Sequence, residues 1–83
     1  MTNVNNANKK IVVIEAGHVV IGNVTELEDR LIIDEASVIR VWGTTAGLGE
    51  IASRGPTKDT VLDPCGMVEC YKPAVIMQIP CKV

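Results

Sequence analysis

The chain is poor in several residue types, and each shortage narrows the folds it can adopt. Its 83 residues include no Phe, one Trp, one Tyr and four Leu, whereas Val and Ile together number 21. β-Branched aliphatic residues favour strands over helices. The chain has no run of about 18 or more apolar residues, which is the length a membrane-spanning helix needs. The composition therefore predicts a soluble, mainly β protein.

Charge and cysteine content exclude further classes of protein. A net charge of −2 with scattered Lys and Arg argues against a general affinity for DNA or RNA, which requires clustered cations. Residues 1–8 lack the apolar core of a signal peptide, so we expect an intracellular protein. Cys65, Cys70 and Cys81 are odd in number, which excludes a complete set of intrachain disulfides and predicts reduced thiols.

The small size of the chain predicts that it associates with itself. For a chain this short, the free energy gained by burying apolar surface and the cost of ordering the chain are both on the order of 120 kcal/mol and nearly cancel. Self-association supplies the missing stability most simply, so we expect a homo-oligomer with closed symmetry. The sequence does not select the number of subunits.

The pattern of apolar residues predicts one β-rich domain over residues 10–83, preceded by a polar, Asn-rich flexible arm over residues 1–9. Residues 11–14 and 18–21 read as a hairpin, because Gly17 supplies the positive φ of a tight turn. Apolar and polar residues do not alternate along either run. This predicts that both faces of each strand are covered, one by the core and one by another subunit.

The remaining segments complete a sheet or small barrel of five to seven mainly antiparallel strands. We expect strands over residues 30–33, 38–42, 60–62, 67–71 and 74–79, with turns at residues 34–37 and 63–66. A single short helix is predicted between about Thr45 and Arg54, because Leu48, Ile51 and Ala52 share one helical face. Gly55 and Pro56 end it.

No catalytic motif is recognisable, so we predict a protein that is not an enzyme and uses no cofactor. The chain has no Ser-His-Asp set, H-E-x-x-H motif, P-loop or dinucleotide fingerprint. Three cysteines and His18 are enough ligands for zinc, but Cys65 and Cys70 are spaced C-x4-C, and structural zinc sites usually use C-x2-C pairs. Structural thiols are therefore the favoured interpretation.

The most informative stretch, residues 40–60, joins a strand to the helix and then to a basic loop. Backbone N–H groups in Gly-rich surroundings bind anions, and one aromatic ring with three cations suits a nucleotide. The candidate ligand-binding residues are Arg40, Trp42, Thr44, Thr45, Arg54, Thr57 and Lys58. The favoured alternative is structural: Trp42 anchors the helix to the sheet, and the Gly and Thr residues form the turn.

The same stretch resembles a family of small bacteriophage and prophage proteins. The similarity covers about residues 11–81 and is most specific in I-R-V-W-G at residues 39–43, L-G-E-I-A at residues 48–52 and G-P-T…T-V-L-D-P-C-G at residues 55–66. The family has no assigned enzymatic activity. The resemblance therefore implies a viral origin and a compact β-rich domain.

A phage origin implies an accessory protein that acts on the host, in the host cytoplasm. The hypothesis we favour is that the oligomer binds and sequesters a phosphorylated small molecule, such as a nucleotide messenger of antiviral signalling, without turning it over. The alternatives are a protein-binding inhibitor of a host enzyme and a minor structural or assembly protein of the virion. We predict no nucleic-acid or membrane partner.

Overall fold

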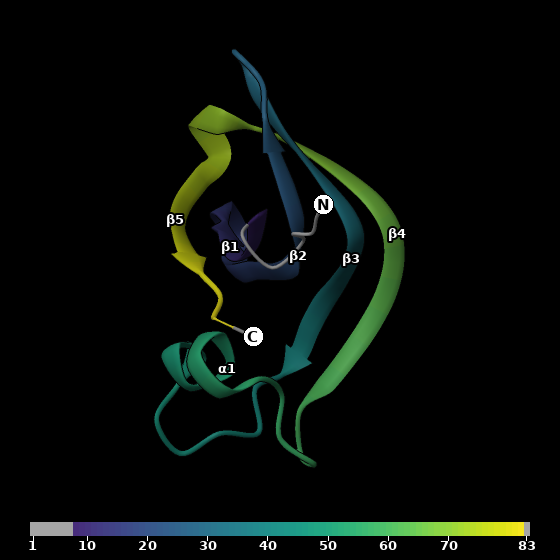
Figure 1. Ribbon diagram of the computed structural model, residues 1–83. Helices are drawn as coiled ribbons and strands as arrows, with labels where there is room; N and C mark the ends of the chain where they lie inside the picture. The colour runs from purple at the N-terminus through teal and green to yellow at the C-terminus, as the bar shows by residue number, and fades with distance from the viewer. Residues whose placement is uncertain (1–7, 83) are drawn as a thin grey trace.

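Residues 8–82 are described by a computed structural model, and they form one curved antiparallel sheet with a single α-helix (Figure 1). The strand order is β4-β3-β2-β1-β5, so β4 and β5 form the two edges of an open sheet. This confirms the predicted mainly β class and selects the sheet over the barrel. In chain order the elements are β1 (Lys9–Ile14), η2 (Glu15–Gly17), β2 (His18–Glu26), β3 (Arg30–Val41), α1 (Leu48–Arg54), β4 (Val61–Tyr71), η3 (Lys72–Ala74) and β5 (Val75–Pro80).

The first hairpin forms as predicted. β1 pairs with β2 in a register that places Ile11 opposite Ile21, and Gly17 has a φ of 83° in the short 3-10 turn that joins them. Lys9 already belongs to β1, so the sheet begins one residue before the predicted domain start. Residues 1–7 of the predicted flexible arm lie outside the described residues.

The turn predicted at residues 34–37 is wrong, because β3 runs without interruption from Arg30 to Val41. The polar residues there form a bulge: Glu35 has a φ of 50°, and the pairing with β4 shifts between Ile33 and Ala36. The second hairpin instead joins β2 to β3 through residues 27–29. A bulge uses the same turn-forming residues but bends the strand without reversing it.

The turn predicted at residues 63–66 is also wrong, because β4 is one strand from Val61 to Tyr71. Pro64 has no backbone N–H, and it is tolerated because β4 is an edge strand with no further strand to which it would donate a hydrogen bond. Gly66, with a φ of 76°, lies opposite Ala36, so the irregularities of β3 and β4 stand side by side. The two strands curve together along their length (Figure 1).

Two hydrophobic clusters hold the sheet on its two faces. Alternate residues of β1 supply both, since Ile11 and Val13 belong to one cluster while Val12 and Ile14 belong to the other. The helix-side cluster contains the buried residues Ile11, Val19, Ile21, Ile39, Leu48, Ile51, Ala52 and Cys81. The inner cluster contains the buried residues Val12, Val20, Val24, Leu31, Ile33, Ala36 and Cys70.

The sheet covers its own inner cluster by curling. Val68 from the β4 edge and Val75 from the β5 edge both pack against this cluster, although the two strands are at opposite sides of the sheet. Ile11 and Val12 are both 0% exposed. Clusters of the same chain therefore cover both faces of β1 at Ile11 and Val12, while Val13 and Ile14 remain partly exposed.

The helix α1 forms on the predicted face but begins later than predicted. Leu48, Ile51 and Ala52 are buried against the sheet. Gly47 has a φ of 82°, which is outside the helical region, so the helix starts at Leu48 instead of near Thr45. It ends at Gly55, whose backbone N–H donates to the carbonyl of Ile51 at 2.8 Å.

Candidate functional site

The loop between β3 and α1 is closed by a side-chain hydroxyl. The Thr44 Oγ1 donates to the carbonyl of Gly47 at 2.9 Å. This bond folds residues 44–47 into a tight loop and satisfies a carbonyl that precedes the helix. The Thr44 hydroxyl therefore donates its hydrogen bond to the backbone of its own loop.

The loop between α1 and β4 is closed in the same way. The Thr57 Oγ1 donates to the carbonyl of Gly43 at 2.7 Å, and the Thr60 Oγ1 donates to the carbonyl of Trp42 at 2.6 Å. The backbone N–H groups of Thr57 and Asp59 in turn donate to these two hydroxyls. Both threonines tie this loop to the end of β3, as the structural interpretation of the stretch predicts.

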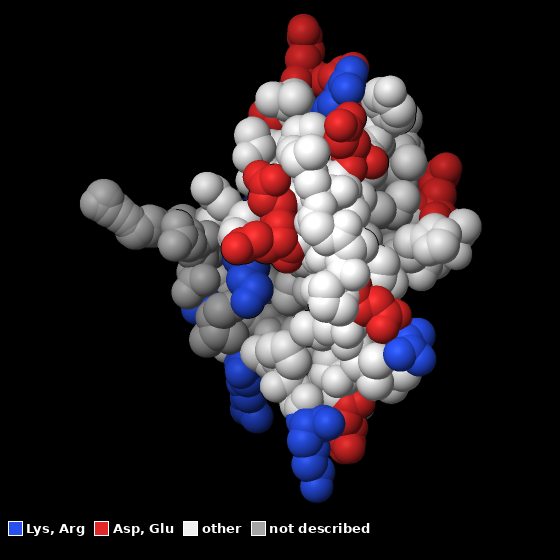
Figure 2. All heavy atoms as spheres, turned by 90° about the vertical axis from the view of Figure 1, so that its right-hand side faces the viewer, with Lys and Arg blue, Asp and Glu red and all other residues white. Residues whose placement is uncertain are grey.

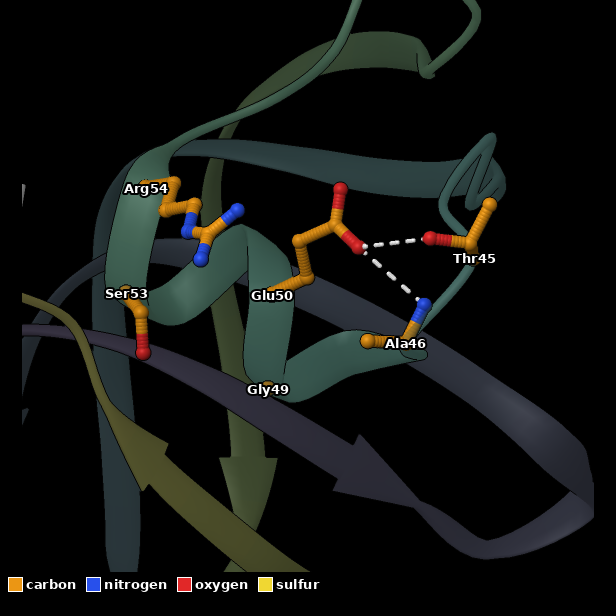
Figure 3. A pocket seen from close by; sticks show the side chains of 6 residues that line it. All are labelled: Thr45, Ala46, Gly49, Glu50, Ser53 and Arg54. Carbon is orange, nitrogen blue, oxygen red and sulfur yellow. Dashed lines mark hydrogen bonds between the residues drawn. The ribbon is translucent and has the colours of Figure 1, made fainter.

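A carboxylate occupies the anion-binding groups of the first loop. The Glu50 Oε1 accepts from the backbone N–H of Ala46 at 3.1 Å and from the Thr45 Oγ1 at 3.4 Å (Figure 3). Glu50 is the third residue of α1, and a Glu at this position commonly reaches back to a free N–H before the helix. The loop therefore already holds a carboxylate oxygen from its own helix.

An open hollow of about 390 Å³ lies between this loop and the exposed side of α1. Thr45 and Ala46 line it from the loop, and Gly49, Glu50, Ser53 and Arg54 line it from the helix. The Arg54 side chain extends toward Glu50 (Figure 3). Arg54 forms no ion pair with another described residue, so its guanidinium is available to an anion.

The hollow gathers only part of the predicted site. Thr45 and Arg54 line it, whereas Arg40, Trp42, Thr44, Thr57 and Lys58 do not. Sequence reasoning missed Ala46, Gly49, Glu50 and Ser53. The signal that would have found Glu50 is its place three residues after Gly47, the residue that precedes the helix.

Arg40 and Trp42 lie at the end of β3 and have separate environments. The Arg40 Nε donates to the Oδ2 of Asp63 on β4 at 2.8 Å, and the Arg40 Nη2 donates to the Asp63 Oδ1 at 3.3 Å. This hydrogen-bonded pair raises the pKa of Arg40 above its usual range. Trp42 is 44% exposed, so only part of its side chain packs against neighbouring residues.

The thiols are dispersed in the structure. Cys70 belongs to the inner cluster and Cys81 to the helix-side cluster, while Cys65 is exposed and lies 3.5 Å from the carbonyl of Ala36. Burial raises the pKa of Cys70 and of Cys81. No group of three metal-ligating side chains occurs within residues 8–82.

None of the helices described in residues 8–82 has the length and apolar content needed to cross a membrane. A comparison with models of known protein families gives no match to this chain, and neither does a comparison with curated proteins.

Proposed function

We propose that this chain is a phage accessory protein that acts in the host cytoplasm by binding, without catalysis, and that its ligand is a phosphorylated small molecule such as a nucleotide messenger. The resemblance to phage and prophage proteins supports the viral origin. Of its most specific segments, residues 39–43, 48–52 and 55–66, the second contributes Gly49 and Glu50 to the lining of the hollow. A protein that only binds its ligand needs no catalytic residues, which agrees with the lack of a recognisable catalytic motif in the sequence.

The observation that carries the proposal is the carboxylate of Glu50 held by the loop. The Ala46 N–H and the Thr45 hydroxyl already bind a carboxylate oxygen of Glu50, and the Arg54 side chain extends toward Glu50 from the other side. A phosphate offers more charge and more acceptor oxygens than a carboxylate, and its hydrogen bonds to Arg are charge-assisted. A phosphate therefore suits the position that Glu50 takes in the free protein.

A phosphate can occupy this position only if it displaces the Glu50 carboxylate. A phosphate and the Glu50 carboxylate repel each other, so the ligand displaces the side chain, which has room to move because the hollow is open. The displaced carboxylate lies near Arg54 and weakens its attraction for the ligand. Removing the charge of Glu50 while keeping its shape therefore strengthens binding.

Isothermal titration calorimetry against a panel of cyclic and linear nucleotides, including adenosine-diphosphate-ribose derivatives, tests the proposal. We expect Glu50→Gln to bind about tenfold more tightly and Arg54→Ala to bind about 10- to 150-fold more weakly, the range for a hydrogen bond to a charged group. Arg40→Ala is the matched control, because Arg40 is paired with Asp63 and does not line the hollow. The proposal fails if no nucleotide binds more tightly than about 100 µM, or if Arg40→Ala and Arg54→Ala have equal effects.

The second candidate function is inhibition of a host enzyme by direct protein contact. The large apolar side chains exposed in residues 8–82 include Val41 and Trp42 at the end of β3, and Met67 and Tyr71 on β4. Protein interfaces are enriched in Trp, Tyr and Met. This candidate gains support if the nucleotide panel is negative and Trp42→Ala abolishes the effect of the protein on its host, while Arg54→Ala does not.

A further inference from the structure

The two edges of the sheet differ in how they are protected. Each edge strand presents a row of backbone N–H and C=O groups that can pair with another strand, and proteins usually block such edges with charges or proline. β4 carries Asp63, Pro64 and Glu69, and the bulge at Gly66 interrupts its line. This edge is therefore poorly suited to pairing.

The β5 edge differs from the β4 edge in composition, although it also has a bulge, at Ile76. Its sequence is V-I-M-Q-I-P, with no charged residue and with proline only at the last position. Ile76 is 64% exposed and Met77 is 47% exposed. The pairing with β1 shifts at this point, so Ile76 has no residue directly opposite it on that strand. An uncharged, apolar edge of this kind is a site for strand pairing.

Carboxylates gather around the start of β5. Val75 lies opposite Ile14, which precedes Glu15, and the Lys72 N–H bonds to the carbonyl of Asp29. In this region Glu15, Glu26, Glu28, Asp29 and Glu69 outnumber Arg30, Lys72 and Lys10, which also lies near Glu26.

Cations gather around the end of β5. Pro80 lies opposite Lys10, the Cys81 N–H bonds to the carbonyl of Lys9, and the Lys82 N–H bonds to the carbonyl of Ala52 in α1. Here Lys9, Lys10, Lys82 and Arg54 outnumber Glu50. On the β4 side of the molecule, Figure 2 shows the same trend: carboxylates are most numerous in the upper part and cations in the lower part.

We propose that two copies of this chain pair edge to edge through antiparallel β5 strands, which continues the sheet across a two-fold axis. In this arrangement the carboxylate-rich start of one β5 lies against the lysine-rich end of the other. A parallel pairing would bring like charges together. Pairing of β5 with β4 would be heterologous and would give a ring or an open filament, whereas pairing of β5 with β5 closes as a dimer. The inference is independent of the ligand proposed for the hollow.

Analytical ultracentrifugation of the full chain over a range of micromolar concentrations tests the dimer. We expect Ile76→Lys to yield monomers, because a charge at this exposed position blocks pairing without disturbing the core. Met67→Lys is the matched control: Met67 is 62% exposed on the β4 edge and receives the same new charge. Circular dichroism establishes that both variants keep the fold.

The orientation is tested by reversing the end charges. Glu15→Lys and Lys82→Glu should each weaken the dimer, and the double variant should restore it, since antiparallel strands bring the two positions toward each other across the axis. Higher salt should weaken the wild-type dimer. A wild-type monomer at about 100 µM, an assembly larger than a dimer, or dissociation by Met67→Lys but not by Ile76→Lys would each overturn the proposal.

Discussion

Replacing Ile51 with Ala tests what holds α1 against the sheet. Ile51 is 1% exposed and lies in the helix-side cluster with Ile11, Ile39 and Leu48. α1 has only seven residues, and an isolated helix shorter than about 12–15 residues is marginal in water. The helix therefore depends on this burial, and so does the hollow that it borders.

The cost of the substitution follows from the buried atoms. Ala lacks three carbon atoms of the Ile side chain, which removes about 2.4 kcal/mol of transfer free energy at about 0.8 kcal/mol per carbon. The cavity adds to this loss, and measured Ile→Ala costs in protein cores are about 2–5 kcal/mol. We expect the free energy of unfolding to fall by about 3 kcal/mol, which lowers the melting temperature by roughly 12–24 °C in a domain of this size.

Urea unfolding measures this loss, with far-UV circular dichroism and the fluorescence of the single tryptophan, Trp42, as two probes. The control is Ser53→Ala, an exposed position on the same helix, which should change the free energy of unfolding by less than about 0.5 kcal/mol. If Ile51→Ala costs less than about 1 kcal/mol at an unchanged urea dependence, burial of Ile51 does not anchor α1.

Two further predictions concern Gly43 and the cysteines. Gly43 has a φ of 64°, and an added Cβ would lie 2.3 Å from the carbonyl carbon of Asp59, so Gly43→Ala should destabilise the fold by more than the about 1–3 kcal/mol of backbone strain alone. In the same urea assay Gly47→Ala should lower the free energy of unfolding by less, because Gly47 has a similar φ but no atom lies within 4 Å of an added Cβ. Iodoacetamide should label Cys65 in the native protein and the two buried thiols only on unfolding. Because burial raises the pKa of Cys70 and Cys81, the native state keeps protons that the unfolded state releases, so stability should fall as pH rises above the ordinary thiol range. Equal labelling rates, or stability that rises with alkaline pH, would contradict this.

Local patterns were sufficient to predict the first hairpin and the buried face of α1, because both depend on residues close in sequence. They were not sufficient to separate a bulge from a turn. Residues 34–37 and 63–66 have typical turn composition, yet both lie within strands. The outcome depends on Ala36 lying opposite Gly66, a pairing between segments 30 residues apart that single-sequence patterns do not reveal.

Local sequence patterns also predicted only part of the candidate site. Thr44 and Thr57 were predicted as ligand donors because of their place near glycines, and the structure has both hydroxyls bonded to backbone carbonyls. Glycines leave backbone carbonyls accessible, so hydroxyls nearby find partners within their own loop. Arg54, on the exposed side of α1, lines the hollow and forms no ion pair with another described residue.

The paired bulges of β3 and β4 also bear on self-association. They accompany a curvature that lets β4 and β5 pack on one inner cluster, so a single chain buries both faces of β1. The sequence-based argument for an oligomer relied on the near-zero stability balance of a single chain and on a second subunit covering one of those faces. Clusters of the same chain pack on both faces of β1, whereas the β5 edge has Ile76 and Met77 exposed. The edge contact that we propose would therefore supply the missing stability without a face-to-face contact.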